Sequence, residues 1–218
     1  MNKDRRIKQT EDGSYTFFIP SMEEHYHSTK GAYTESQHIY IENGFNTFNQ
    51  QTLSVLEIGF GTGLNTFLTA LEAEKRGLKT DYTTLERYPL LWDEVELLHQ
   101  SAHRLFREIH ICPWEVPCTL SPCFTLHKMQ CNYPDAVFKL PPEHYDLVYF
   151  DAFAPEKQPE MWQEELFQQL YVIMKPHGKL TTYCVKGEIR RMLERCRFKT
   201  KRLPGPPQGK KQILNALK

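Results

Sequence analysis

Residues 53–65 read LSVLEIGFGTGLN, a short apolar run followed by three alternating glycines. Beyond the glycines, Leu64, Phe67, Leu68 and Leu71 fall at i, i+3, i+4 and i+7, the spacing of one helix face. Gly77 then supplies a helix stop. The stretch therefore predicts a strand at Leu53–Ile58, a glycine turn and a helix.

The same alternation continues along the chain. Further strands are predicted at Tyr82–Leu85, Phe124–Met129, Tyr145–Phe150 and Lys179–Cys184. Helices are predicted at Pro89–His103, Pro159–Met174 and Lys186–Cys196. Strands that alternate with helices favour a parallel sheet covered on both faces, so we expect an α/β fold.

The two ends of the chain differ from this middle part. Phe198–Leu203 and Gln212–Leu217 flank a loop rich in Pro and Gly, which predicts an antiparallel C-terminal hairpin. Residues 13–48 are less regular, with short candidate strands at Tyr15–Ile19 and His38–Ile41. No linker divides the 218 residues, so we expect one domain, with residues 1–50 as a cap and 51–218 as the core.

Charge is balanced overall but unevenly distributed. The chain has 27 basic and 27 acidic residues, yet residues 186–218 hold eleven Lys or Arg against two Glu, a local net charge of +9. A basic patch attracts polyanions and releases their counterions, which suggests nucleic acid. A solvated helix face is the alternative interpretation.

No stretch approaches the roughly 20 apolar residues of a membrane span, and the polar start lacks the apolar core of a signal peptide. We therefore expect a cytoplasmic protein. The six cysteines form no C-x-x-C pair and are expected to be free thiols. Because no close histidine pair accompanies Cys112, Cys118 and Cys123, no metal site is predicted.

The glycine spacing indicates the class of cofactor. Glycine allows a tight turn and lets a ligand lie against the backbone. A nicotinamide-binding turn would place its third glycine where Leu64 stands. The spacing Gly59, Gly61, Gly63, preceded by Glu57, instead suits a cofactor with an amino-acid moiety, although a purely structural turn is the alternative.

Side chains at the next two strand ends extend this site. Glu86 can accept two hydrogen bonds from ribose hydroxyls, and Asn132 lies where an adenine ring would reach. A surface glutamate and a loop asparagine are the alternatives for these two positions.

The fourth strand ends in Asp151–Pro155 (DAFAP), with Met161-Trp162 soon after. Here the sequence resembles the tRNA 5-methylaminomethyl-2-thiouridine methyltransferase family, the S-adenosylmethionine-dependent half of a bifunctional bacterial wobble-uridine enzyme. The resemblance covers roughly residues 30–217. Its other blocks follow in family order: Thr34–His38 with Glu42-Asn43, Glu57–Asn65, Lys186–Arg191 and Pro204–Lys211.

The resemblance implies a Rossmann-like class I methyltransferase with a mostly parallel seven-stranded sheet. It implies N-methylation of the aminomethyl group of 5-aminomethyl-(2-thio)uridine at the tRNA wobble position. Many relatives carry Gly-Asp for the adenine contact, and this chain departs from them with Cys131-Asn132. The expected S-adenosylmethionine contacts are Glu57, Gly59, Gly61, Gly63, Asn65, Glu86, Asn132, Asp151 and Phe153.

Methylation of an amine requires a neutral nitrogen with its lone pair aimed at the methyl group. Asp151 is the expected catalytic residue, because at a strand end it could orient the amine or take its proton. A carboxylate that caps the next segment is the alternative. Tyr33, Phe153 and Trp162 could supply flat walls for the uracil ring, although Leu166 at i+4 also favours burial of Trp162.

The basic residues would contact the anticodon stem-loop of tRNA. Lys186 and Arg190 follow the fifth strand, and Lys210 and Lys211 follow the Pro/Gly loop, so both pairs could rim the same face and hold phosphates. Glu35, in the first family block, completes the expected substrate-binding set.

The bifunctional relatives also carry a flavin-dependent oxidoreductase domain. We find no second glycine fingerprint, so we expect this chain to methylate the aminomethyl form without producing it, with a separate oxidoreductase as a partner. Alternatives are a methyltransferase for a small-molecule or protein amine, an aminopropyltransferase, and a non-catalytic RNA-binding Rossmann module. A nicotinamide oxidoreductase is disfavoured by Leu64.

Overall fold

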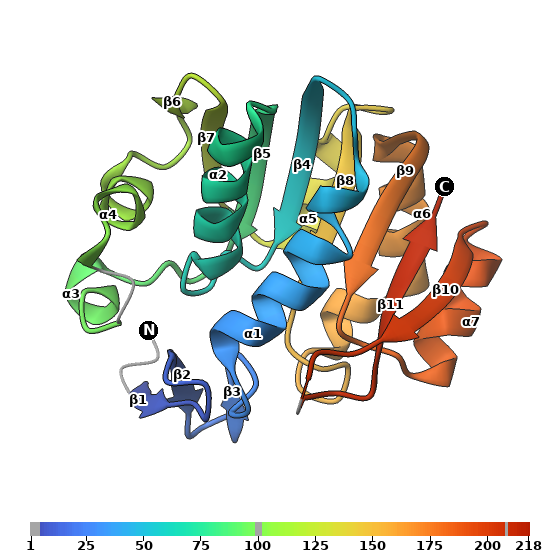
Figure 1. Cartoon of the computed structure of the whole chain (residues 1–218). Helices are drawn as coiled ribbons and strands as arrows, with labels where there is room; N and C mark the ends of the chain where they lie inside the picture. Colours follow the sequence, from blue (N-terminus) through green and yellow to red (C-terminus); the bar gives the residue numbers. More distant parts are fainter. Residues whose placement is uncertain (1–4, 99–101, 208) are drawn as a thin grey trace.

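The computed structural model describes residues 5–98, 102–207 and 209–218 (Figure 1). Its centre is an eight-stranded sheet in the order β10-β11-β9-β8-β4-β5-β7-β6. The five inner strands run parallel to one another. Their bounds are β4 Thr52–Ile58, β5 Lys79–Glu86, β7 Phe124–Gln130, β8 Tyr145–Phe150 and β9 Met174–Thr182.

Antiparallel strands complete the sheet at both sides. The predicted C-terminal hairpin is confirmed as β10 (Lys199–Pro204) and β11 (Gln212–Leu217), with β11 lying between β9 and β10. On the other side, β6 (Cys118–Ser121) pairs with β7. The expected count of seven strands is corrected to eight, because the short, partly exposed β6 carries too little apolar patterning to be predicted.

The strands bury both faces, as the two-residue period of a strand requires. In β4, Leu53 and Val55 pack in one apolar cluster, whereas Leu56 and Ile58 pack in another. Helix α2 (Leu64–Arg76) covers the first face, and α6 (Glu164–Ile173) and α7 (Gly187–Arg195) cover the second (Figure 1). Helices on both faces of a mostly parallel sheet form the predicted α/β fold.

Two predicted elements differ in the structure. In the range Pro89–His103, where one helix was expected, the structure describes the short α-helix α3 (Trp92–Val95). Residues 99–101 lie outside the described residues, and α4 (Arg104–Ile111) begins just after the range. The His103 side chain accepts a hydrogen bond from the Leu105 N–H, which starts α4. The helix expected at Pro159–Met174 is split into a 3-10 turn, Pro159–Trp162, and α6, and α5 (Tyr133–Ala136) is a short additional helix.

The N-terminal region forms a small sheet of β1 (Arg6–Gln9), β2 (Tyr15–Ile19) and β3 (Glu24–His25), followed by α1 (Ala32–Ser36). The strand predicted at His38–Ile41 is wrong, since Gln37–Glu42 is a π-helix that continues α1. Its buried run Ile39-Tyr40-Ile41 resembles a strand in sequence but packs as one helical turn. The Asn215 side chain donates to the Asn43 carbonyl oxygen (3.0 Å), which ties this region to β11.

Candidate active site

The glycine turn lies directly against the end of β8. Gly59 has φ +96°, and a Cβ added there would lie 2.7 Å from the carbonyl oxygen of Asp151. The turn can therefore approach β8 this closely only with glycine at this position. As a result, the loop after β4 and the loop after β8 are held together at the carboxyl ends of the strands, where open α/β sheets bind ligands.

Glu86, at the end of β5, is fixed beside this turn. One carboxylate oxygen accepts a hydrogen bond from the Gly61 N–H (3.0 Å), and the other accepts from the Tyr88 N–H (2.8 Å). Each oxygen has a second lone pair, so the carboxylate can still accept hydrogen bonds from a ligand.

A cavity of about 460 Å³ opens in front of the turn and Glu86. The loops that follow β4, β5, β7 and β8 contribute to its wall, together with residues of the N-terminal region. Seven of the predicted donor contacts line it: Gly59, Gly61, Asn65, Glu86, Asn132, Asp151 and Phe153.

Glu57 does not line this cavity, and its predicted contact with the methyl donor stays a prediction. Its side chain is fully buried beneath the turn, where one oxygen accepts hydrogen bonds from Thr66 (2.8 Å) and Thr84 (2.7 Å). Burial raises the pKa of Glu57 to about 8. Glu57 therefore ties β4 to α2 and β5 and is mainly protonated at neutral pH.

Gly63 is also absent from the cavity wall. A Cβ at this position would lie 2.8 Å from Nε2 of His110 and 2.9 Å from the Phe60 ring. The third glycine therefore allows α4 to pack against the start of α2. Its predicted contact with the cofactor stays a prediction.

Asp151 stands at the centre of the site. Its carboxylate accepts a hydrogen bond from the Asn65 side-chain amide at 2.8 Å. Burial raises the pKa of Asp151 to about 6, although the nearby Tyr40 hydroxyl and the hydrogen bond from Asn65 oppose the shift. Above that pH, Asp151 is an anion that can accept a further hydrogen bond.

A second cavity, of about 340 Å³, lies on the other side of residues 151–153. Asp151, Ala152, Phe153, Tyr26 and His27 line both cavities. The Tyr26 and Phe153 rings meet edge to face with centroids 5.4 Å apart. The two cavities are therefore neighbours that share a wall built around Asp151.

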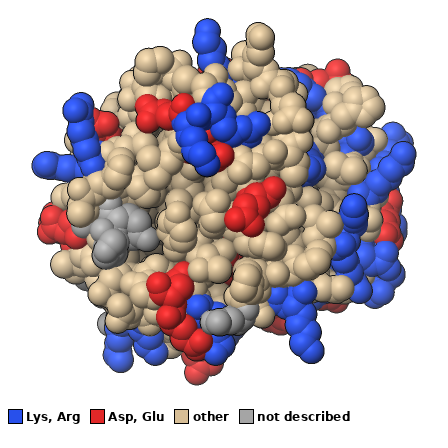
Figure 2. All heavy atoms as spheres, viewed as in Figure 1, with Lys and Arg blue, Asp and Glu red and all other residues tan. Residues whose placement is uncertain are grey.

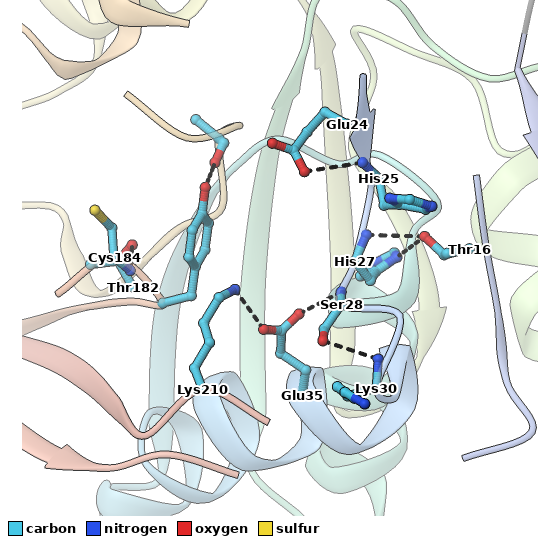
Figure 3. Close-up of polar contacts among 12 residues, drawn as sticks. Thr16, Glu24, His25, His27, Ser28, Lys30, Glu35, Thr182, Cys184 and Lys210 are labelled. Carbon is cyan, nitrogen blue, oxygen red and sulfur yellow. Dashed lines mark hydrogen bonds and ion pairs between the residues drawn. The ribbon is translucent and has the colours of Figure 1, made fainter. Parts of the chain in front are cut away.

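An ion pair lies in the second cavity (Figure 3). The Lys210 ammonium is 2.7 Å from one oxygen of Glu35, and the other oxygen accepts from the Ser28 N–H at 2.9 Å. The same ammonium lies 3.9 Å from the centroid of the Tyr183 ring, whose hydroxyl donates to the Ala152 carbonyl. Lys210 therefore lines the second cavity, and its role in substrate binding stays a prediction.

The other predicted substrate residues do not line either cavity. Tyr33 is exposed and lines a separate groove. Trp162 is buried, the alternative that Leu166 at i+4 favoured, and its Nε1 donates to the Phe153 carbonyl oxygen (2.8 Å) and holds that segment in place. Its role as a base-stacking wall stays a prediction. Lys186 pairs with Glu156, Arg190 pairs with Glu194, and Lys211 is exposed.

Sequence reasoning missed Tyr26, His27 and Tyr183. Burial lowers the pKa of His27 to about 4, so this histidine in the shared wall is neutral at physiological pH. The only signal in the sequence was the cluster His25-Tyr26-His27, which stands in no recognisable motif.

Neither a metal-binding cluster nor a membrane-spanning helix is found in the part of the chain that the structure describes. No cluster of three His, Cys, Asp or Glu side chains there could hold a metal ion, and all six cysteines are free thiols. No described helix combines the length and apolar character that a membrane crossing requires.

Comparisons with known proteins place this geometry in context. Residues 123–218 match the profile of a family described as S-adenosyl-L-methionine-dependent methyltransferase. The chain is 31% identical over 211 residues to the tRNA 5-methylaminomethyl-2-thiouridine biosynthesis bifunctional protein MnmC of Pseudomonas fluorescens. That alignment covers 83% of this chain and 30% of the relative, so the chain spans about a third of its length.

Solved structures share the fold. The crystal structure of MNMC2 from Aquifex aeolicus superposes with a TM-score of 0.83 at 20% identity, covering 97% of this chain and 69% of that one. Spermidine synthase from Thermotoga maritima gives a TM-score of 0.56 at 16% identity, covering 99% and 69%. At these identities, the two likenesses establish a common architecture.

Proposed function

We propose that this chain methylates the aminomethyl group of 5-aminomethyl-(2-thio)uridine at the tRNA wobble position. The chain belongs to the S-adenosylmethionine-dependent methyltransferase family of the bifunctional tRNA 5-methylaminomethyl-2-thiouridine biosynthesis proteins. The observation that carries the proposal is the pair of adjoining cavities with Asp151 in their common wall.

The first cavity suits the methyl donor. Gly61 presents no side chain to it, and Glu86 offers oxygen lone pairs for ribose hydroxyls. Asn132, which follows β7, also lines this cavity, and it would contact the edge of the adenine ring. When bound, the donor supplies an electrophilic methyl group on a positively charged sulfur.

The second cavity suits the amine acceptor. Among the carboxylates that line the two cavities, Asp151 is common to both, whereas Glu35 belongs to the second and Glu86 to the first. An ionised Asp151 would accept an N–H hydrogen bond from a neutral amine and so aim the nitrogen lone pair toward the first cavity. After transfer, the same carboxylate would take the proton that the secondary ammonium releases.

A tRNA substrate is supported by the surface charge. Lys and Arg side chains gather along the edge where β10 and α7 lie (Figure 2). Lys186 and Arg190 already have acidic partners, so Lys211 and the exposed Lys199 and Lys201 are better placed to contact phosphates than the two predicted residues of α7. Phosphate contacts would fix the register of the anticodon stem-loop, and an extruded base would enter the second cavity.

The decisive experiment is mass spectrometry of tRNA nucleosides after incubation with the protein and isotopically labelled S-adenosylmethionine. A labelled methyl on the wobble aminomethyl group is expected. tRNA that carries the carboxymethylaminomethyl form should give no product unless a separate flavin-dependent oxidoreductase is added. Labelling of an added polyamine or a protein lysine, with tRNA unlabelled, would overturn the proposed substrate. A cytoplasmic location, where tRNA is modified, belongs to the same proposal.

A further inference from the structure

Lys210 reaches the second cavity from the loop between β10 and β11. Its ammonium lies 2.7 Å from Glu35 and 3.9 Å from the centroid of the Tyr183 ring. Asp151 lines the same cavity. Figure 3 shows the Lys210 side chain extending toward the Glu35 carboxylate, which Ser28 holds from the other side.

These groups together form a receptor for a primary alkylammonium. A carboxylate pairs with the charge and accepts its hydrogen bonds, and an aromatic face attracts a cation through its quadrupole. The lysine head group is itself a primary alkylammonium. A protonated aminomethyl substituent on a nucleobase enters with the same head group, the same charge and the same three donors. It then releases one proton to solvent, and Asp151 aims the resulting neutral amine.

We propose that Lys210 takes the place of the substrate amine in the free enzyme. Its ammonium pairs with the Glu35 carboxylate and leaves it when the aminomethyl group of the substrate enters the second cavity. This inference rests on the proposed function, because it names the part of the cavity that the acceptor amine takes. It makes Lys210 and Glu35 determinants of acceptor specificity.

The two partners differ in how firmly they are held. The Lys210 side chain is 39% exposed, whereas that of Glu35 is only 10% exposed and is anchored by the Ser28 N–H. Partly exposed ion pairs contribute little to stability, so the lysine can leave while the carboxylate stays. Glu35 is thus the fixed half of the pair and Lys210 the exchangeable half.

Displacement of Lys210 would favour an amine carried by tRNA over a free amine. A small amine must break the Glu35–Lys210 pair and leaves the lysine without a new anion. A tRNA brings phosphates to the same face, and one of them can accept the displaced ammonium. The basic loop then contributes to phosphate binding only after the acceptor has entered.

The test measures binding of ethylammonium by ligand-observed NMR in the presence of S-adenosylhomocysteine. Lys210→Met keeps the aliphatic stem and removes the ammonium, so ethylammonium should bind at least about tenfold tighter than to the wild-type protein. Lys211→Met is the matched control, because it removes the same charge from the neighbouring exposed lysine, which lines neither cavity. Adding Glu35→Gln to Lys210→Met should abolish the gain.

The inference is overturned if Lys210→Met binds ethylammonium no better than the wild type, or if Lys211→Met gains as much. Lys210→Gln serves as a second substitution if the methionine variant does not fold. Labelling of tRNA by the wild-type protein is scored separately. If Lys210→Met gains ethylammonium binding but the wild type leaves tRNA unlabelled, the amine site stands and the nucleoside assignment fails.

Discussion

The two cavities share the wall at residues 151–153 but are assembled in different ways. The first is built largely from loops that directly follow neighbouring parallel strands. The second combines residues 24–29, Glu35, Tyr183 and Lys210, which come from the N-terminal region, the end of β9 and the C-terminal hairpin. On the proposed assignment, donor binding depends on the sheet, whereas acceptor binding depends on segments far apart in the chain.

Asp151→Asn should have the largest effect, because Asp151 lines both the proposed donor cavity and the proposed acceptor cavity. We expect methyl transfer to fall by about 10²- to 10⁴-fold, because asparagine can neither take the proton nor hold the amine as a carboxylate does. In the wild type, kcat/KM should rise as pH passes about 6, where Asp151 ionises. Steady-state kinetics across pH should show that this rise is missing in the variant, and an unchanged turnover would remove Asp151 from the mechanism.

Glu57→Gln tests whether the buried Glu57 carboxyl group is protonated in the folded protein. The folded protein keeps a proton on Glu57 up to about pH 8, whereas the unfolded chain releases it near pH 4.5. Wild-type stability therefore falls as pH rises between these values, and the glutamine variant lacks this contribution. From pH 5 to pH 8 the variant should gain roughly 2 to 4 kcal/mol relative to the wild type.

Denaturant unfolding at several pH values measures this difference. Parallel stability curves for the two proteins would show that Glu57 is ionised in the folded state.

Glu86→Gln separates the donor side from the acceptor side. Loss of charge-assisted hydrogen bonds, worth about 1.5–3 kcal/mol each, should weaken S-adenosylmethionine binding by about 10- to 100-fold in calorimetry. Exposed Glu165 on α6 offers a control, since Glu165→Gln changes the same charge away from both cavities. A comparable loss in the control variant would mean that net charge, rather than this contact, governs affinity.

The smallest effect is expected from Tyr183→Phe on the acceptor side. The change removes the hydrogen bond to the Ala152 carbonyl but keeps the ring beneath Lys210. The KM for tRNA should rise by a factor that corresponds to about 0.5–1.5 kcal/mol, while donor affinity stays the same. Weaker binding of S-adenosylmethionine in calorimetry would show that the two cavities are not separable.

The contrast between the cavities also explains what the sequence could predict. The strands around the first cavity have apolar runs of the right length, and ligand-binding residues follow each strand end, so Gly59, Glu86 and Asp151 could be placed from local order alone. Local order gave no sign of the contacts at two motif positions. Glu57 accepts hydrogen bonds from buried threonines, and Gly63 leaves room for His110.

The second cavity could not be predicted in the same way. Glu35 and Lys210 are 175 positions apart, and their pairing depends on how the N-terminal region packs against the C-terminal hairpin. The π-helix at Gln37–Glu42 and the helix α4 were missed, and the helix that contains α3 was predicted too long, for a related reason: tertiary packing rather than a long periodic pattern stabilises these short helices.

Gly59 and Gly77 both have a positive φ, but they differ in which other residues each position can tolerate. Every codon change that replaces glycine adds a Cβ, which at Gly59 would meet the Asp151 carbonyl oxygen, whereas the space beside Gly77 is open within 4 Å. A saturation library selected for donor binding should therefore return glycine almost alone at position 59. At position 77 it should also return asparagine, the non-glycine residue that best tolerates left-handed backbone. Substitution is thus excluded at Gly59, in the turn before α2, but tolerated at Gly77, which follows the last residue of α2.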